Sequence, residues 1–301
     1  MLFYLFAIDK CIYIIKINGL SFIFGPAMET SKKTKIMTST NCECKDNSIE
    51  KCDIFDFMAK YVGLSVLHPG GFISTNKLLE LSKLDKSKKV LDIACGKGTT
   101  SILIAKRFGC KVVGIDISPD LIEEAKALSI KNKIDSLTDF QVADATRLPF
   151  IDNEFDVSIA QAMLVLIDDK ESVIREALRV LKPTGLAGWI ELTWRKNPSE
   201  QFMQQVSNVI CAYCMLNVRI SDDWNKLFVQ SGASGLQTII YPMHFSGFPG
   251  MIKDEGVSNS IRVIRKYLTD SKVRTRMNTM NKFFKRNEDI FGYGIYTMTK
   301  K

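Results

Sequence analysis

Short runs of β-branched residues alternate with helical patterns between residues 89 and 193, and this alternation limits the fold more than any other feature of the chain. It predicts strands over residues 89–94, 111–116, 139–143, 156–160 and 186–193, with helices over 99–108, 119–132 and 169–181. Strand and helix at this spacing specify a parallel sheet with right-handed crossovers and helices on both faces. The predicted fold class is therefore α/β, a doubly wound Rossmann-like sheet whose ligand lies at the carboxyl ends of the first strands.

The remaining segments differ in composition and are expected to be separate parts of the molecule. Residues 1–53 form an apolar and then polar leader that should be poorly ordered, and residues 54–85 form an N-terminal helical cap. The core is expected over 86–245, with helices between 199 and 231 near the site of the ligand that reacts there. Residues 246–290 read as a basic helical insertion, a lid over the site that is helical from about 257 to 287, and residues 291–301 as the final core strand.

The net charge of +8 is concentrated at the C-terminal end, because residues 251–301 hold 12 basic and 5 acidic residues. The first 250 residues are nearly neutral, which argues against nucleic acid as a partner and favours a small molecule. A basic run is often only a solvated helix face, but a functional one would attract an anionic acceptor or a membrane surface.

The number of cysteines and the N-terminal segment indicate the cellular compartment. Eight cysteines are too sparse for a disulfide scaffold, so we expect a cytoplasmic protein. The first 24 residues are apolar but are interrupted by Asp9, Lys10 and Lys16, which makes them a poor signal peptide and a poor membrane span. They could still associate peripherally with a membrane, or precede a natural start at Met28 or Met37.

The segment from Asp92 to Thr100 is the most informative about the ligand. A buried strand leads into a tight turn of small residues and then into a helix, so that Gly96 and Gly98 let the backbone approach a ligand at the helix N-terminus. A nicotinamide-dinucleotide site begins in the same way, and Asp116 at the end of the second strand would suit it. The glycines alone therefore leave two classes of cofactor open.

Charge favours one of the two cofactors. Asp92 lies near the carboxyl end of the strand that leads into the glycine turn, where it would repel the diphosphate of a dinucleotide. S-adenosylmethionine has no phosphate and carries an ammonium and a sulfonium, which Asp92 would attract. Asp116 could then accept hydrogen bonds from the ribose hydroxyls, and Asp144, after the third strand, from the adenine amino group.

Several short motifs follow one another in a fixed order. They are Asp92 to Gly98, Gly114 to Ser118, Ala143 to Phe150, Phe155 to Val157 and Glu176 to Pro183. Together they resemble the motifs of class I S-adenosylmethionine-dependent methyltransferases, and in particular the small-molecule branch (methyltransferase type 11-like) that includes the ubiquinone/menaquinone C-methyltransferases. The resemblance covers about a third of the chain. It implies a seven-stranded sheet of order 3-2-1-4-5-7-6 and transfer of a methyl group to a small organic acceptor, with S-adenosylhomocysteine as by-product.

The resemblance also assigns roles to individual residues. The backbone of Ala94, Gly96 and Gly98 would cradle the methionine moiety, whose amino group Asp92 would reach. Further contacts are expected from Asp116 and Ile117 to the ribose, Asp144 and Ala145 to the adenine, and Gln161 beside the methyl group. The family usually has glycine at the position of Ala94, and alanine is a mild change there if the backbone φ is negative.

Methyl transfer from a sulfonium is an in-line displacement that needs no metal, so we expect few catalytic residues. A general base would help an acceptor that loses a proton, and the chain has only two histidines, His68 and His244. His68, in a turn before the core, is a candidate, as is Glu191 at the end of the fifth strand, which is expected to face the acceptor cleft. The other hypotheses are an NAD-dependent oxidoreductase of similar fold and a non-catalytic S-adenosylmethionine-binding module.

Overall fold

The computed structural model describes residues 13–17, 20–24, 49, 54–210, 213–243 and 247–301, in two compact units, Met1–Thr38 and Ser39–Lys301. In the first unit, β1 (Tyr13–Ile17) and β2 (Leu20–Phe24) pair antiparallel and form a hairpin within the predicted leader. The rest of the leader, apart from Ile49, lies outside the described residues. No helix within the described ranges is long and apolar enough to span a bilayer.

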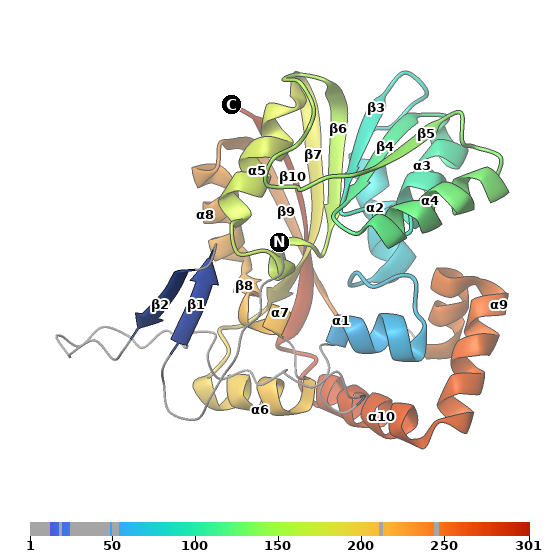
Figure 1. Ribbon diagram of the computed structural model, residues 1–301, viewed down its shortest axis with the longest axis vertical. Coiled ribbons are helices and arrows are strands. Elements are labelled where there is room, and N and C mark those ends of the chain that lie inside the picture. Colours follow the sequence, from blue (N-terminus) through green and yellow to red (C-terminus); the bar gives the residue numbers. More distant parts are fainter. Residues whose placement is uncertain (1–12, 18–19, 25–48, 50–53, 211–212, 244–246) are drawn as a thin grey trace. The chain divides into compact units, whose positions relative to one another are not determined.

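The second unit is built on one mixed sheet (Figure 1). Its long strands are β3 (Lys89–Ile93), β4 (Lys111–Asp116), β5 (Thr138–Val142), β6 (Phe155–Gln161), β7 (Leu181–Trp194), β9 (Ala233–Pro242) and β10 (Phe291–Lys300). They lie in the order β5-β4-β3-β6-β7-β10-β9, with the first five parallel and β10 antiparallel to both of its neighbours. Counted along the chain this is 3-2-1-4-5-7-6, which confirms the predicted order. A two-residue strand that we did not predict, β8 (Arg219–Ile220), pairs with the end of β7.

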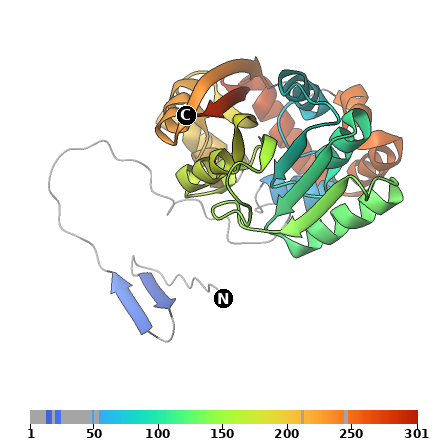
Figure 2. The same ribbon diagram turned by 90° about the horizontal axis from the view of Figure 1, so that it is seen from above.

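Helices cover both faces of this sheet, as the alternation predicted (Figures 1 and 2). One face carries α2 (Gly71–Leu81), α3 (Thr99–Phe108) and α4 (Pro119–Lys131), and the other carries α5 (Lys170–Arg179) and α8 (Ser221–Gln230). Successive strand residues point to opposite faces. Val90 therefore packs in the cluster that includes Ile104 of α3, whereas Leu91 and Ile93 pack in the cluster that includes Ile174 of α5.

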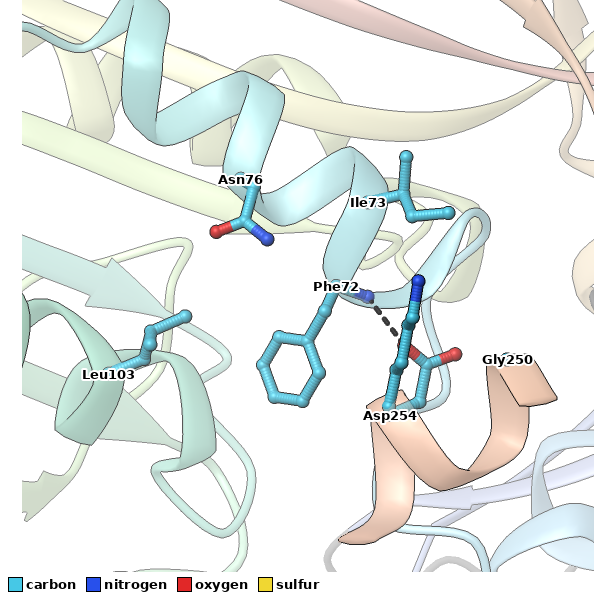
Figure 3. Close-up of a pocket in the computed structure, with 7 residues that line it drawn as sticks. Phe72, Ile73, Asn76, Leu103, Gly250 and Asp254 are labelled. Carbon is cyan, nitrogen blue, oxygen red and sulfur yellow. Dashed lines mark hydrogen bonds between the residues drawn. The ribbon is translucent and has the colours of Figure 1, made fainter.

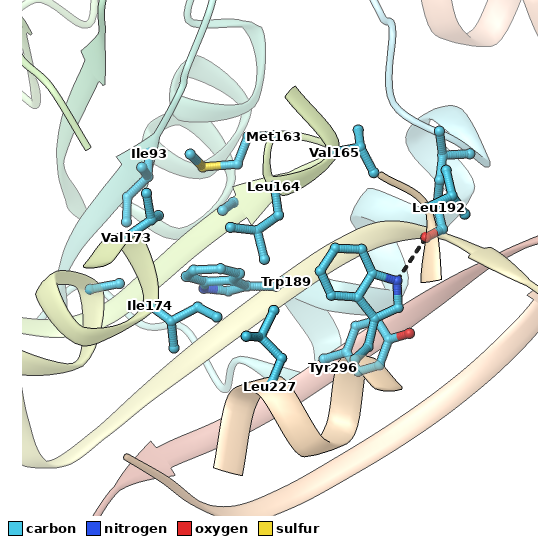
Figure 4. Close-up of a cluster of buried hydrophobic side chains, with 14 of the residues drawn as sticks. Ile93, Met163, Leu164, Val165, Val173, Ile174, Trp189, Leu192, Leu227 and Tyr296 are labelled. Atoms are coloured by element: carbon cyan, nitrogen blue, oxygen red, sulfur yellow. Dashed lines mark hydrogen bonds between the residues drawn. The ribbon is translucent and has the colours of Figure 1, made fainter. Parts of the chain in front are cut away.

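The larger core cluster is centred on Trp189 of β7 (Figure 4). This side chain is 1% exposed, and its ring meets the ring of Phe228 edge-on with centroids 5.6 Å apart. Ile174 from α5 and Leu227 from α8 close around it, and Trp224 Nε1 donates to the Leu192 carbonyl at 2.9 Å. Large aromatic groups thus fix α5 and α8 on the sheet.

A second group of helices lies beyond the carboxyl ends of the parallel strands (Figure 1). It comprises α1 (Ile54–Asp56), the π-helical η2 (Phe57–Val62), α6 (Glu200–Ile210), α7 (Tyr213–Leu216), α9 (Gly247–Thr269) and α10 (Ser271–Arg286). The single basic helix that we predicted is two helices, because the Asp270 carboxylate accepts hydrogen bonds from the backbone N–H groups of Lys272 and Val273 and so begins α10.

Two carboxylates attach α9 to the N-terminal cap. Glu255 accepts hydrogen bonds from the backbone N–H groups of Ser65 and Val66, at 2.9 and 3.0 Å. Asp254 Oδ1 accepts from the N–H of Phe72 at 2.8 Å, in the first turn of α2, beside a cavity of about 480 Å³ between α2, α3 and α9 (Figure 3). These bonds satisfy N–H groups that the cap leaves unpaired, and they hold α9 against the cap.

Candidate functional site

A pocket of about 610 Å³ opens where β3, β4, β5 and β6 end. Eight of the nine predicted cofactor residues line it: Asp92, Ala94, Gly96, Asp116, Ile117, Asp144, Ala145 and Gln161. The parallel register brings them together, since it sets Asp92 of β3 beside Gly114 of β4, two residues before Asp116. The pocket therefore lies at the predicted edge of the sheet.

The two glycines of the turn have different structural roles. Gly96 has φ +54°, and a Cβ built on it meets no atom within 4 Å, so the backbone here opens into the pocket and leaves room for a ligand to approach closely. Gly98, at φ +73°, lies outside the pocket lining, and a Cβ there would come within 2.7 Å of the Phe140 ring. This glycine lets the start of α3 pack closely on Phe140 of β5, and its expected contact with the cofactor stays a prediction.

Ala94 also has a left-handed backbone, with φ +56°. The condition under which alanine would be a mild change is therefore not met, because a Cβ at this φ lies too close to the following carbonyl oxygen. We expect Ala94→Gly to raise the free energy of unfolding by about 0.5–1 kcal/mol, measured from the urea midpoint at unchanged m value. Ala127→Gly in the exposed middle of α4 is the control and should lower it by about 1 kcal/mol. Equal losses from both changes would contradict the strain at Ala94.

Asp92 is the most deeply placed acid of the site. It is 2% exposed, and Ser101 Oγ donates to its Oδ2 at 2.6 Å. Burial, with a smaller contribution from the nearby charge of Asp116, raises the pKa of this carboxyl to about 7, although the hydrogen bond from Ser101 acts to lower it. A cation in the pocket would favour the ionised form of Asp92, whereas an anion would not.

The other two acids, Asp116 and Asp144, accept hydrogen bonds from the loops at the strand ends. Asp116 accepts from the backbone N–H of Gly96 through Oδ2 and from that of Ser118 through Oδ1, both at 3.0 Å, so it ties the glycine turn to the start of α4. Asp144 is exposed, and its Oδ1 accepts from the backbone N–H and the hydroxyl of Thr146. With Asp92 these residues make the edge of the pocket strongly acidic, which fits a cationic ligand without phosphate groups.

A chain of hydrogen bonds crosses the pocket between the cap and α3. Thr75 Oγ1 donates to Gln161 Oε1 at 2.8 Å, and Gln161 Nε2 donates to Thr100 Oγ1 at 3.0 Å. His68 lines the pocket, and its Nε2 lies 3.2 Å from Thr75 Oγ1. Since the Thr75 proton is directed to Gln161, His68 Nε2 carries the hydrogen of that contact. Burial lowers the pKa of His68 to about 4, so the ring is neutral at pH 7.

Thr75 and Thr100 were not predicted from the sequence, because a threonine in a helical pattern carries no signal of its own. The only local hint was the position of Thr100 in the first turn of α3, next to the glycine turn.

Glu191 lies behind the pocket and not in it. The side chain is fully buried, outside the pocket lining, and its Oε1 accepts from the backbone N–H groups of Met163 and Leu164 at 3.2 and 3.0 Å. Burial raises its pKa to about 8. The expectation that Glu191 faces the acceptor cleft is therefore corrected: its carboxyl group supports from behind the segment that supplies Met163 to the pocket wall.

The cap, and not the C-terminal helices, forms the outer wall. Phe55 and residues 65–68 line the pocket, whereas no described residue of 199–231 or 246–290 does, so neither the predicted lid nor the predicted acceptor helices contribute to its described lining. Asp254 and Glu255 instead attach α9 to the cap. His244 lies outside the described residues. Within the described ranges, no group of three or more histidine, cysteine, aspartate or glutamate side chains is placed to hold a metal ion.

Comparisons with known proteins agree with this arrangement. A family model described as a methyltransferase domain matches residues 84–231. An uncharacterized protein of Haemophilus influenzae is 33% identical over 216 residues, which cover 70% of this chain and 83% of the relative. Phosphoethanolamine N-methyltransferase 1 of Zea mays is 28% identical over 222 residues, or 73% of this chain, which spans 38% of the length of that enzyme.

A solved structure has the same fold. Phosphoethanolamine N-methyltransferase 2 of Haemonchus contortus, in complex with S-adenosyl-L-methionine, superposes with a TM-score of 0.62 at 20% identity, over 82% of this chain and 56% of the other. Together with the family match and the acidic pocket at the strand ends, this establishes that the chain belongs to the class I S-adenosylmethionine-dependent methyltransferases, with S-adenosylmethionine as its co-substrate.

Proposed function

We propose that this protein transfers the methyl group of S-adenosylmethionine to a small organic acceptor in the cytoplasm, with S-adenosylhomocysteine as the product. The observation that carries the proposal is the single pocket that collects the strand-end acids and the open backbone at Gly96. The space beside Gly96 and the negative edge suit a cationic nucleoside whose methionine end must come close to the main chain. Cys95 and Cys110 are free thiols, which accords with a reducing compartment.

Each part of the co-substrate has a partner at one strand end. Asp92 would take the ammonium group, and the backbone at Ala94 and Gly96 the methionine carboxylate end. Asp116 and Ile117 would hold the ribose, and Asp144 and Ala145 the adenine. Gln161 borders the place of the methyl group, where its hydrogen bonds to Thr75 and Thr100 fix its orientation. The co-substrate supplies the electrophilic methyl group, and these residues bind and orient it.

The acceptor side of the pocket is apolar. Its lining includes Phe55, Val66, Leu67, Met163, Leu166 and Ile167. The one lysine or arginine among the described lining residues is Lys97, which pairs with Glu124 at 2.8 Å, and His68 is neutral. We therefore infer that the acceptor presents an uncharged group with an apolar body to the methyl donor, since an anionic group here would have no unpaired cation.

Methyl transfer then requires that the acceptor atom approach the methyl carbon and that water be excluded from the cleft. An apolar wall keeps the sulfonium in a water-poor cleft, and an acceptor atom held about 3–3.5 Å from the methyl carbon can displace the sulfur in line. Among the described lining residues His68 is the one histidine, and because its Nε2 hydrogen is bonded to Thr75, an acceptor that must lose a proton would have to deliver it to Nδ1.

Binding measurements test the proposal first. Calorimetry should detect S-adenosylhomocysteine at micromolar affinity and no binding of NAD⁺, and Asp116→Asn should weaken the former at least 30-fold. Asp120→Asn is the matched control, four residues away and exposed in the first turn of α4, and it should leave the affinity within twofold. Binding of NAD⁺ in place of S-adenosylhomocysteine would overturn the proposal.

Turnover is tested separately. Protein, methyl-labelled S-adenosylmethionine and fractionated cell extract should give a labelled small product that is extracted into organic solvent. Cofactor binding without a labelled product from any fraction would identify a non-catalytic binding module.

A further inference from the structure

The segment that follows β6 forms one wall of the pocket and is bound from behind by polar side chains. We call residues 162–167 the wall segment, which includes the 3-10 helix η3 (Leu164–Leu166). Four of its residues line the pocket: Ala162, Met163, Leu166 and Ile167. Ala162 has a left-handed backbone, with φ +55°, which is strained for a residue other than glycine. Such strain persists only where the surrounding structure fixes the backbone.

The first half of the wall segment is bound to β7. The N–H of Ala162 donates to the Ile190 carbonyl at 2.6 Å. The next two N–H groups, of Met163 and Leu164, donate to the buried carboxyl group of Glu191. The strained turn at Ala162 is therefore fixed to the strand beside it.

The second half of the wall segment is bound by two side chains from outside the sheet. Asn217, which follows α7, donates from Nδ2 to the Val165 carbonyl at 3.1 Å. Lys170 Nζ donates to the Ile167 carbonyl at 2.5 Å and to Asn217 Oδ1 at 3.3 Å. The lysine and the asparagine thus form one hydrogen-bonded unit that holds two carbonyl groups of the wall segment.

Lys170 is an unusual residue for its position. It is 4% exposed, and it is the first residue of α5, where the helix dipole disfavours a cation. An apolar side chain of similar length would fill the same space without taking a charge out of water. It would, however, have no donor for the Ile167 carbonyl or for Asn217. The contacts of the ammonium group therefore point to the wall segment as the part of the protein that needs this lysine.

We propose that Lys170 and Asn217 are positioning residues for methyl transfer, which act through the wall segment to align the acceptor with the methyl group. This inference rests on the function proposed above. Met163, Leu166 and Ile167 are three of the apolar residues on the acceptor side of the pocket. Gln161, which would border the methyl group, directly precedes the wall segment. A displacement of about 1 Å in such a wall can slow a reaction on the order of 100-fold.

Hydrogen exchange followed by mass spectrometry tests the support without an acceptor. With S-adenosylhomocysteine bound, the amide hydrogens of the wall segment should exchange at least about tenfold faster in Lys170→Met and in Asn217→Ala than in the wild type. Ser129→Ala is the matched control, because it also removes a buried side-chain hydrogen bond, to Thr138 near the C-terminal end of α4. This control should leave exchange in the wall segment unchanged.

Turnover tests the consequence for the reaction, with methyl-labelled S-adenosylmethionine and the extract fraction that yields labelled product. Both variants should bind S-adenosylhomocysteine within threefold of the wild type, which shows that the fold and the co-substrate site are intact. At saturating amounts of the fraction, their kcat should be at least about 30-fold lower. A purely structural role would lower the free energy of unfolding and leave the kcat of the folded protein unchanged.

The outcomes separate this inference from the proposed function. Unchanged exchange in the wall segment, or an unchanged kcat in both variants, would overturn the positioning role alone. A wild type that binds no S-adenosylhomocysteine, or that yields no labelled product from any fraction, would overturn the proposed function together with it.

Discussion

S-adenosylhomocysteine should bind about 20-fold more tightly at about pH 7.5 than at about pH 5.5. Asp92 is buried with a pKa of about 7 in the free protein, and the ammonium group of the ligand requires its ionised form. Below pH 7 most molecules must lose the Asp92 proton before they bind, which lowers the apparent affinity about tenfold per pH unit. Above pH 7 the carboxylate is already ionised and the affinity levels off. Calorimetry at low pH, in buffers of different ionisation enthalpy, should also show that binding of the ligand releases about one proton.

Two variants separate Asp92 from other titrating groups. Asp92→Asn should bind more weakly at about pH 7.5, and its affinity should no longer depend on pH. Ser101→Ala should move the midpoint to higher pH, because the Ser101 hydroxyl donates to the Asp92 carboxylate and lowers its pKa. A wild-type affinity that is independent of pH over this range would show that Asp92 does not meet the ammonium group.

Glu191→Ala should lower the free energy of unfolding by on the order of 3 kcal/mol at pH 6, measured by urea denaturation. The substitution leaves the N–H groups of Met163 and Leu164 without their acceptor and opens a cavity beside β7. Glu191→Gln keeps an acceptor oxygen in nearly the same shape, so at about pH 4.5, where Glu191 is protonated in the folded protein, it should be close to the wild type. The pair of variants distinguishes the loss of the hydrogen bonds from the loss of the titrating group.

The pH dependence has a defined sign. Burial raises the folded-state pKa of Glu191 to about 8, above that of an unfolded glutamate, so the folded protein binds the proton more strongly. Stability from this group is full below about pH 4.5 and is lost as the pH rises toward 8. At pH 9 the buried carboxylate is ionised, and Glu191→Gln should exceed the wild type by on the order of 2 kcal/mol. Glu200→Gln, exposed in α6, should show no such gain, and a gain equal to that of Glu191→Gln would refute the assignment.

Local patterns predicted the sheet and its edge well. The β4 strand at 111–116 and the α3 helix at 99–108 have the predicted bounds, because an apolar strand and a glycine on each side of α3 mark them within a few residues. Acids that directly follow parallel strands must meet at one edge. Eight predicted cofactor residues consequently line the pocket, although their individual contacts remain predictions.

Features that depend on distant packing were not predicted. The direction of the Glu191 side chain depends on the segment after β6 that packs beside it, and the outer wall of the pocket depends on the path of the cap. The amphipathic pattern of 257–287 shows a helix but not the surface on which it lies. One signal was available and not used: Asp270 before Ser271 is a helix-capping residue, and it marks the break between α9 and α10.

The hydrogen bond from Ser65 to Glu255 joins residues 190 positions apart. A growing chain on the ribosome can form the glycine turn and its acids early, because these residues are close in sequence. The cap segment, in contrast, can be fastened only after Glu255 has left the exit tunnel. The outer wall of the pocket is therefore fastened only when synthesis is nearly complete, and a prematurely terminated chain would have the glycine turn but lack the anchor for the cap.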